Sequence, residues 1–270
     1  MIIADDFGLL KEANAEIGIL LEERAVTAAS LLVNGPAFED AAKRIEAHAE
    51  WSIGFHFNLT EGRSVCPARE ISSLVNRKGS FKYSIVQLCA LTRLGLLPVA
   101  HISKEIDAQW SLFRSVCPSA HHISGHQHVH LLPGVIDCIL SLAKRSEVFH
   151  VRYPFEERQL SLFRPIRSMR MGFLRCLCRR ARPVFHEKGF ETGKKFYGFY
   201  DAGNLSVETM VSLIRACGDD GVEIMCHPGN TDKPERRDGF TVRHYRESTD
   251  TDVCRCLRKK LRALPKKNEK

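Results

Sequence analysis

Hydrophobic and polar positions follow two alternating patterns along the chain. Short apolar runs at residues 1–4, 27–33 and 53–57 stop at polar residues or glycine, which is typical of buried strands. Residues 10–25 and 37–50 instead place apolar side chains three or four positions apart, which predicts helices. The resulting order of strand, helix, strand and helix predicts parallel strands joined by right-handed crossovers.

The same alternation continues to the end of the chain, with two interruptions. Residues 63–81 form a loop rich in turn-forming residues that could cover a site, and residues 156–200 break the rhythm and are expected to be an insertion. We expect one α/β domain over residues 1–270, built as a closed or nearly closed barrel and ending in a basic tail at 258–270. The remaining predicted elements are helices at 101–116, 135–146, 206–221 and 251–264, and strands at 121–130, 148–154 and 222–229.

Polar residues capable of chemistry gather where the predicted strands end. In a barrel of parallel strands the carboxyl ends open on one mouth, where reactive groups collect. These side chains are therefore expected to meet, although they lie far apart in the sequence. The residues concerned are Asp5 and Asp6, His56 and Asn58, His126 and His128, Arg152, and His227.

Adjacent carboxylates close the first strand. Asp5 and Asp6 repel each other unless a positive charge lies beside them. A divalent cation removes the repulsion, and one aspartate can then bind it while the other accepts a proton. The alternative is an exposed turn or a helix cap, for which aspartate is also favoured.

Three histidines alternate in the segment SGHQHVHLLPG, at residues 124–134. In a strand this spacing sends His126, His128 and His130 to one face, with the first two near the mouth and His130 deeper and structural. His56 lies in an apolar strand, either as a metal ligand or as a hydrogen-bonded core residue. A carboxylate with two imidazoles suits a catalytic divalent metal, which polarises a carbonyl and activates water.

Two further strand-end residues complete the candidate set. His227, in the segment CHPG, is placed to act as a general acid toward a leaving group. Arg152 is either a surface ion-pair partner or a group that orients the site carboxylates or a substrate oxygen.

The charge and the cysteine content limit the binding partners and the cellular compartment to be expected. The formal net charge is +8, and residues 158–182 contain eight arginines and no acid. Such a segment attracts phosphates, acidic glycans or an anionic membrane surface, or is simply a solvated basic face. No apolar run is long enough to cross a bilayer, so membrane contact would be peripheral. The ten cysteines and the absence of a secretion signal indicate reduced thiols in the cytoplasm.

Four motifs in order resemble those of the YdjC-type carbohydrate deacetylases: ADDFG, GFHFNLTEG, SGHQHVHLLPG and CHPG. The resemblance covers most of residues 1–155 and returns at about 196–250. It implies a distorted TIM-type barrel that removes acetyl groups from N-acetylated sugars with one divalent metal ion, magnesium or zinc.

The resemblance also implies a role for each residue that matches a motif. Ser124 stands where many relatives carry an acidic residue or asparagine, which weakens support for the neighbouring histidines. His126 and His128 could exchange roles. The implied roles are metal ligation for Asp6, His56 and His126, general base for Asp5, general acid or substrate contact for His227, and substrate binding or support of the ligands for His128, Asn58 and Arg152.

The arginine-rich segment resembles the hopanoid-associated branch of this family. That likeness implies a glycolipid substrate reached at a membrane face, whereas contact with a second subunit in a homodimer is the alternative use of the segment. Two other functions are compatible with the residues. One is a metal-dependent phosphoesterase of the histidinol-phosphatase type, with several metals. The other is a basic nucleic-acid-binding or membrane-binding protein on a barrel scaffold, although no nucleic-acid partner is expected.

Overall fold

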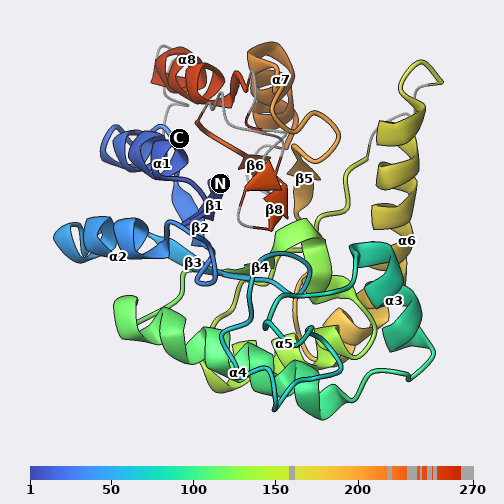
Figure 1. The fold of residues 1–270 in the computed structure, drawn as a ribbon. Coiled ribbons are helices and arrows are strands. Elements are labelled where there is room, and N and C mark those ends of the chain that lie inside the picture. The colour runs from blue at the N-terminus through green and yellow to red at the C-terminus, as the bar shows by residue number, and fades with distance from the viewer. Residues whose placement is uncertain are drawn as a thin grey trace.

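Six parallel strands form the central sheet of the computed structural model, which describes residues 1–157, 162–217, 221–229, 236–237, 239–241, 245 and 248–262. The strand order is β4-β3-β2-β1-β6-β5, and the sheet curls into a half-barrel (Figure 1). The strands are β1 (Ile2–Phe7), β2 (Ala28–Leu31), β3 (Ile53–Phe57), β4 (Ile123–Gly125), β5 (Lys195–Tyr197) and β6 (Val222–Cys226). The α/β class and the parallel strands of the central sheet follow the sequence prediction, whereas closure into a full barrel is not confirmed.

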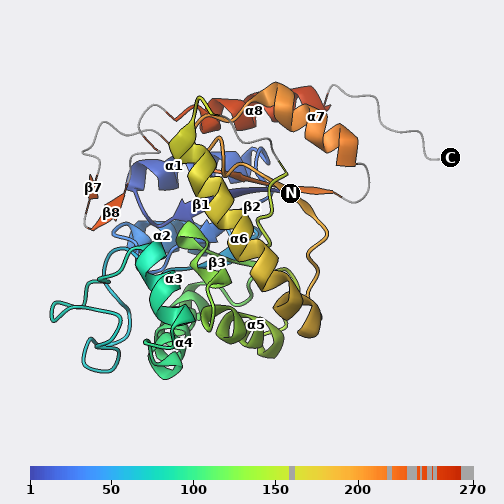
Figure 2. The same ribbon diagram turned by 90° about the vertical axis from the view of Figure 1, so that its right-hand side faces the viewer.

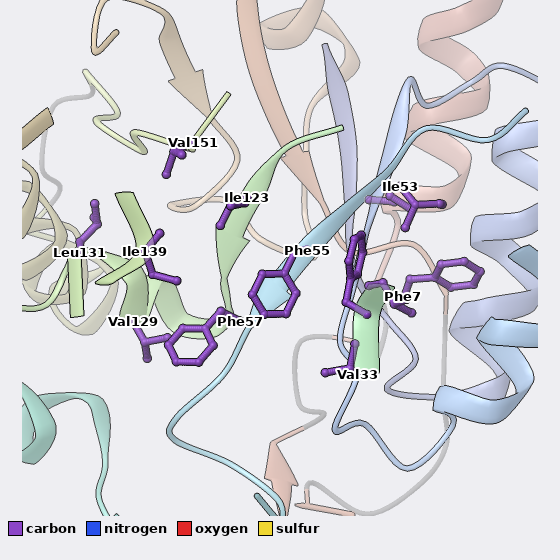
Figure 3. Close-up of a cluster of buried hydrophobic side chains, with 14 of the residues drawn as sticks. Phe7, Val33, Ile53, Phe55, Phe57, Ile123, Val129, Leu131, Ile139 and Val151 are labelled. Carbon is purple, nitrogen blue, oxygen red and sulfur yellow. The ribbon is translucent and has the colours of Figure 1, made fainter. Parts of the chain in front are cut away.

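Helices surround the sheet and bury its apolar strands (Figures 1 and 2). In Figure 3 the side chains of Phe55, Phe57, Ile123 and Val129 lie near one another in the buried hydrophobic cluster. A short antiparallel pair, β7 (Arg236–Arg237) and β8 (Phe240–Thr241), lies apart from the main sheet. The helices are α1 (Lys11–Glu22), α2 (Phe38–Ala47), α3 (Ile85–Arg93), α4 (Val99–Val116), α5 (Val135–Arg145), α6 (Pro165–Glu187), α7 (Val207–Cys217) and α8 (Asp250–Arg262).

The predicted strand at 121–130 is wrong beyond Gly125. β4 ends there, opposite the last residue of β3, and a 3-10 helix, η1 (His126–Leu131), follows. Beyond the end of β3 the chain has no strand partner for its backbone, so it turns, with Gln127 and His128 in left-handed conformations at φ 51° and 59°. The three histidines therefore do not share one strand face, and the argument from their alternation fails.

Two further predictions change in detail. The strand expected at 148–154 reduces to a single parallel bridge between Val151 and Ile123. The expected insertion at 156–200 contains α6 and also β5, which pairs with β6 and so belongs to the sheet. Arg158 and residues 263–270 of the basic tail lie outside the described residues.

Helix α4 anchors the loop that follows β3. The Glu105 side chain is fully buried and accepts hydrogen bonds from the backbone N–H groups of Val65 and Cys66 at 3.0 and 2.9 Å. Gln109 donates to Glu105 and to the Asn58 carbonyl, each at 2.7 Å. Burial raises the pKa of Glu105 to about 6, because these hydrogen bonds only partly offset the loss of water.

We expect Glu105 to make the protein less stable as the pH rises from about 4.5 to about 6. In the unfolded chain Glu105 has the ordinary pKa of 4.5, so the folded protein binds the proton more tightly than the unfolded chain does. This tighter proton binding stabilises the folded state at low pH, and the stabilisation is lost once Glu105 is ionised in both states. The shift corresponds to about 2 kcal/mol. Urea unfolding gives the free energy of unfolding of the wild type and of Glu105→Gln. The wild-type value minus the Glu105→Gln value should be about 2 kcal/mol larger at pH 4 than at pH 7. A difference independent of pH would contradict the assignment.

Candidate metal centre

The end of β1 brings two consecutive carboxylates into the buried interior. Successive side chains of a regular strand point to opposite faces. Here the pairing of β1 with β2 becomes irregular between Ala4 and Phe7, and Asp6 adopts a left-handed φ of 63°. Asp5 and Asp6 are accordingly both almost fully buried, and each reaches a different set of polar partners.

Asp6, His56 and His126 converge at the carboxyl edge of the sheet. Their candidate ligand atoms all lie within 4.8 Å of one another. Asp6 Oδ1 is 2.8 Å from His126 Nδ1 and 3.3 Å from His56 Nε2. One carboxylate oxygen and two imidazole nitrogens form a donor set that magnesium, zinc, manganese and cobalt all accept. The residues present therefore fit a divalent cation.

Glu61 holds the other nitrogen of His126, a role that the sequence analysis missed. Its Oε2 lies 3.1 Å from His126 Nε2, and its carboxylate accepts from the Thr241 hydroxyl and backbone N–H. Burial raises the pKa of Glu61, but the contact with His126 outweighs it and lowers the pKa to about 2. With Nε2 occupied, His126 presents Nδ1 to Asp6. The clue in the sequence was an acid three residues after Asn58 in the motif GFHFNLTEG.

Asp6 and Glu61 together create a site that favours positive charge. Burial lowers the pKa of His126, but the two carboxylates raise it to about 10 in the absence of a cation. A bound divalent ion would supply that positive charge in place of the imidazole proton. Tyr245, also missed from the sequence, adds a hydroxyl donor 3.4 Å from Asp6 Oδ2.

A chain of hydroxyl groups fixes the tautomer of His56. His56 Nδ1 lies 2.8 Å from Ser124 Oγ, Ser124 donates to Ser30 Oγ at 3.2 Å, and Ser30 donates to Asp5 Oδ1 at 2.8 Å. Because the ionised Asp5 can only accept, each hydroxyl proton points toward it. His56 must then donate from Nδ1, which leaves the lone pair of Nε2 facing Asp6.

Gly54 permits a second contact to this chain. The His122 Nε2 atom lies 2.8 Å from Ser30 Oγ, and the hydroxyl proton of Ser30 already points to Asp5, so His122 is the donor. A Cβ at position 54 would lie 2.2 Å from the His122 ring, which makes this approach possible only over glycine. Burial lowers the pKa of His122 well below its usual range, consistent with a neutral ring.

Arg152 neutralises Asp5. Its guanidinium is fully buried, donates to both carboxylate oxygens of Asp5, and also pairs with Glu223. Burial raises the pKa of Asp5, but Arg152 outweighs it and holds the pKa well below its usual range. The interpretation of Arg152 as a surface ion-pair partner is wrong, because its guanidinium is fully buried against Asp5, and its part in the reaction stays a prediction.

The two remaining histidines differ in access. His227 has a side chain 12% exposed, with Nε2 3.9 Å from Asp6 Oδ2. His128 is buried against the rings of Phe196 and Phe199, its Nδ1 has no hydrogen-bond partner among the described residues, and burial lowers its pKa well below the usual range. His126, not His128, belongs to the three-residue cluster.

Two other predicted residues have internal roles. The amide of Asn58 accepts from the backbone of Thr60 and Glu61 and donates to the Glu61 carbonyl, so it shapes the loop that carries Glu61. His130 is fully buried and donates from Nε2 to the Arg152 carbonyl at 2.9 Å, in the deep position expected from the sequence.

Comparison with known proteins identifies a family and a fold. The family model described as YdjC-like protein matches residues 1–260. The chain is 34% identical over 235 residues to the carbohydrate deacetylase of Geobacillus stearothermophilus, covering 87% of this chain and 80% of that protein. It is 33% identical over 247 residues to the carbohydrate deacetylase of Mus musculus, covering 87% of this chain and 79% of that protein.

More distant similarities agree with these. The chain is 27% identical over 253 residues to the chitooligosaccharide deacetylase of Proteus mirabilis, covering 92% of this chain and 87% of that protein. A crystal structure from Enterococcus faecalis, of a protein whose given name refers to cellobiose-phosphate cleavage, aligns with a TM-score of 0.68 and 22% identity. That alignment covers 97% of this chain and 93% of the other, and it shows a shared fold.

Ser124→Ala should weaken binding of a divalent metal by about 10- to 100-fold, because His56 loses the acceptor that orients it. Isothermal titration of the purified protein with zinc or cobalt measures this directly. Ser115→Ala, which removes an exposed hydroxyl of α4, is the matched control and should bind metal as the wild type does. Unchanged affinity in Ser124→Ala would mean that the hydroxyl chain does not act on His56.

Proposed function

The chain belongs to the YdjC-like family, and on that basis we propose that it is a metal-dependent hydrolase that removes acetyl groups from N-acetylated sugars. The names of its relatives support a carbohydrate substrate and an amide bond as the target. The observation that carries the metal dependence is the convergence of Asp6, His56 and His126 on one point. The substrate is an N-acetylated oligosaccharide or glycolipid.

Asp6 Oδ1, His56 Nε2 and His126 Nδ1 would hold the metal. When bound, a divalent ion polarises the substrate carbonyl and lowers the pKa of water. The contribution of the chain is orientation: the Ser124 contact fixes His56, and Glu61 fixes His126. Magnesium and zinc are the ions we favour for this donor set, and one ion per chain suffices for the reaction.

Asp5 is the proposed general base. Arg152 holds the pKa of Asp5 well below its usual range, so the carboxylate is ionised at neutral pH and can accept a proton. Among the described residues, its Oδ2 accepts a hydrogen bond only from Arg152 Nη1, which leaves a lone pair for the attacking water. A carboxylate with so low a pKa holds a proton only briefly, and we propose that Asp5 releases it after His227 has protonated the leaving amine.

His227 is the proposed general acid. It lies beside Asp6 at the edge of the site, and its partial exposure lets it approach a substrate nitrogen. His128 is buried and its pKa is lowered well below the usual range, so it would be protonated too rarely to serve as the acid. We assign His128 to substrate contact, through the Nδ1 atom that lacks a partner among the described residues.

A pocket of about 240 Å³ adjoins the loop that carries Glu61, and none of its lining residues is a candidate metal ligand. It is formed by the loops that follow β2 and β3, and one of its lining residues, Asn34, donates to the Glu61 carbonyl at 3.2 Å. Polar side chains from Arg63 and Glu39 also line it. We propose that it receives a sugar unit next to the one that reacts.

The phosphoesterase alternative requires several metals. Among the residues that the structure describes, Asp6, His56 and His126 form the one group of three candidate ligands, which favours a single ion. A nucleic-acid-binding function rests on net charge alone and accounts for neither the buried aspartates nor the histidine ligands.

Exchange of each aspartate for asparagine should separate metal binding from proton transfer. Asp6→Asn should lose both bound metal and activity. Asp5→Asn should retain the metal but release acetate about 10²- to 10⁴-fold more slowly, because it lacks the base. Acetate release from a panel of N-acetylated sugars, measured alongside metal content, tests both. A full-rate Asp5→Asn enzyme would exclude Asp5 as the base.

Replacement of His227, the proposed general acid, should slow the reaction most when the leaving group is poor. His227→Ala should slow acetate release from an N-acetylated sugar by about 10²- to 10⁴-fold. The loss should be much smaller with an acetyl ester of 4-nitrophenol, whose leaving group departs without protonation. Comparison with His128→Ala, which should raise KM and lose similar activity with both substrates, identifies the acid. Equal losses on the two substrates for His227→Ala would assign it to substrate binding.

A further inference from the structure

The start of α6 presents a cluster of exposed apolar side chains. We call residues 162–170 the α6 tip. Leu162 and Phe163 are 95% and 97% exposed, and Ile166 and Met169 are 63% and 69% exposed. Soluble proteins rarely expose several large apolar side chains together unless the surface binds a partner or a membrane.

Arginines accompany these apolar groups. Residues 162–186 contain seven arginines and no aspartate or glutamate. Arg164 and Arg167 lie 3.7 and 4.0 Å from Asp201, an acid that is itself largely buried. Arg170 and Arg180 are exposed. The surface thus combines apolar side chains with arginines, two of which, Arg164 and Arg167, lie near Asp201.

The α6 tip lies on the same side of the sheet as the metal centre. Arg167 donates to the Tyr200 carbonyl at 3.0 Å, and Tyr200 follows the carboxyl end of β5. The carboxyl ends of these parallel strands form one edge, which also carries Asp6 and His56. Figure 1 shows the start of α6 at the periphery of the molecule, and Figure 2 shows α6 crossing the side of the sheet from there.

We propose that the α6 tip is a docking surface for an anionic lipid bilayer. Phe163, Ile166 and Met169 would enter the boundary between headgroups and acyl chains, where apolar side chains leave water. Arg170 and the other arginines would contact the anionic headgroups. No helix among the described residues combines the length and apolarity required to cross a bilayer, so the contact is peripheral. Docking through this tip places the carboxyl edge of the sheet near the membrane.

Vesicle sedimentation of the full chain tests this docking independently of deacetylation. The protein should pellet with vesicles of 70% phosphatidylcholine and 30% phosphatidylserine, and much less with phosphatidylcholine alone. Phe163→Ser with Ile166→Ser should reduce binding at least tenfold, and Arg170→Glu about fivefold or more. Higher salt should weaken binding. All of these side chains are exposed, so the variants should fold and keep wild-type activity on a soluble N-acetylated sugar.

Phe149→Ser and Lys43→Glu are matched controls, because they change an exposed apolar and an exposed basic residue outside the tip. Both should bind vesicles as the wild type does. The proposal is overturned if the wild type does not pellet with anionic vesicles, or if the tip variants bind them unchanged. It is also overturned if the tip variants convert a dimer into a monomer without vesicle binding by the wild type, since the tip would then contact a second copy.

Discussion

The burial of two adjacent carboxylates at the end of β1 is the constraint on which the site depends. Asp5 and Asp6 are almost fully buried, and two unpaired charges there would be prohibitively costly. The two carboxylates have different partners. Arg152 neutralises Asp5 through both carboxylate oxygens, whereas Asp6 faces two imidazoles and depends on a cation or an imidazole proton for its countercharge. The backbone irregularity at Asp6 makes this division possible.

The two halves of the site remain connected through hydroxyl groups. Ser30 and Ser124 carry hydrogen bonds from His56 to Asp5, so the charge that Arg152 stabilises also determines which nitrogen of His56 is free. Ser124 is the hydroxyl that contacts His56 directly, at 2.8 Å from Nδ1. Ser124 donates to Ser30, and Ser30 donates to Asp5, so the negative charge of Asp5 lies at the end of this chain of hydrogen bonds.

Much of this could be predicted from the sequence because local patterns determine it. The alternation of apolar runs and helical spacing gave the order of parallel elements, and parallel strands place their carboxyl ends on one edge. Asp6, His56 and His126 therefore meet although they are far apart in the chain. The Glu61 carboxylate was missed because its importance depends on a turn, shaped by Asn58, that directs it toward His126.

Other features depend on tertiary context that the sequence pattern does not contain. The alternation of histidines from 126 to 130 resembles a strand, but β3 ends opposite Gly125 and leaves no partner for a longer one. A closed or nearly closed barrel was predicted from the alternation of strands and helices, whereas the structure shows a half-barrel with single-bridge pairing at Val151. Tyr245 stands outside any recognisable motif, and only the fold brings its hydroxyl to Asp6.

Anomalous diffraction at a metal absorption edge, from crystals grown with zinc or cobalt, tests the central claim most directly. The account predicts one ion per chain at this edge of the sheet, bound by an oxygen of Asp6, Nε2 of His56 and Nδ1 of His126. It also predicts that His56 Nδ1 remains within hydrogen-bond distance of Ser124 and that Asp5 stays paired with Arg152. An ion bound by Asp5 or His128 in place of these ligands, or two ions sharing the site, would contradict it.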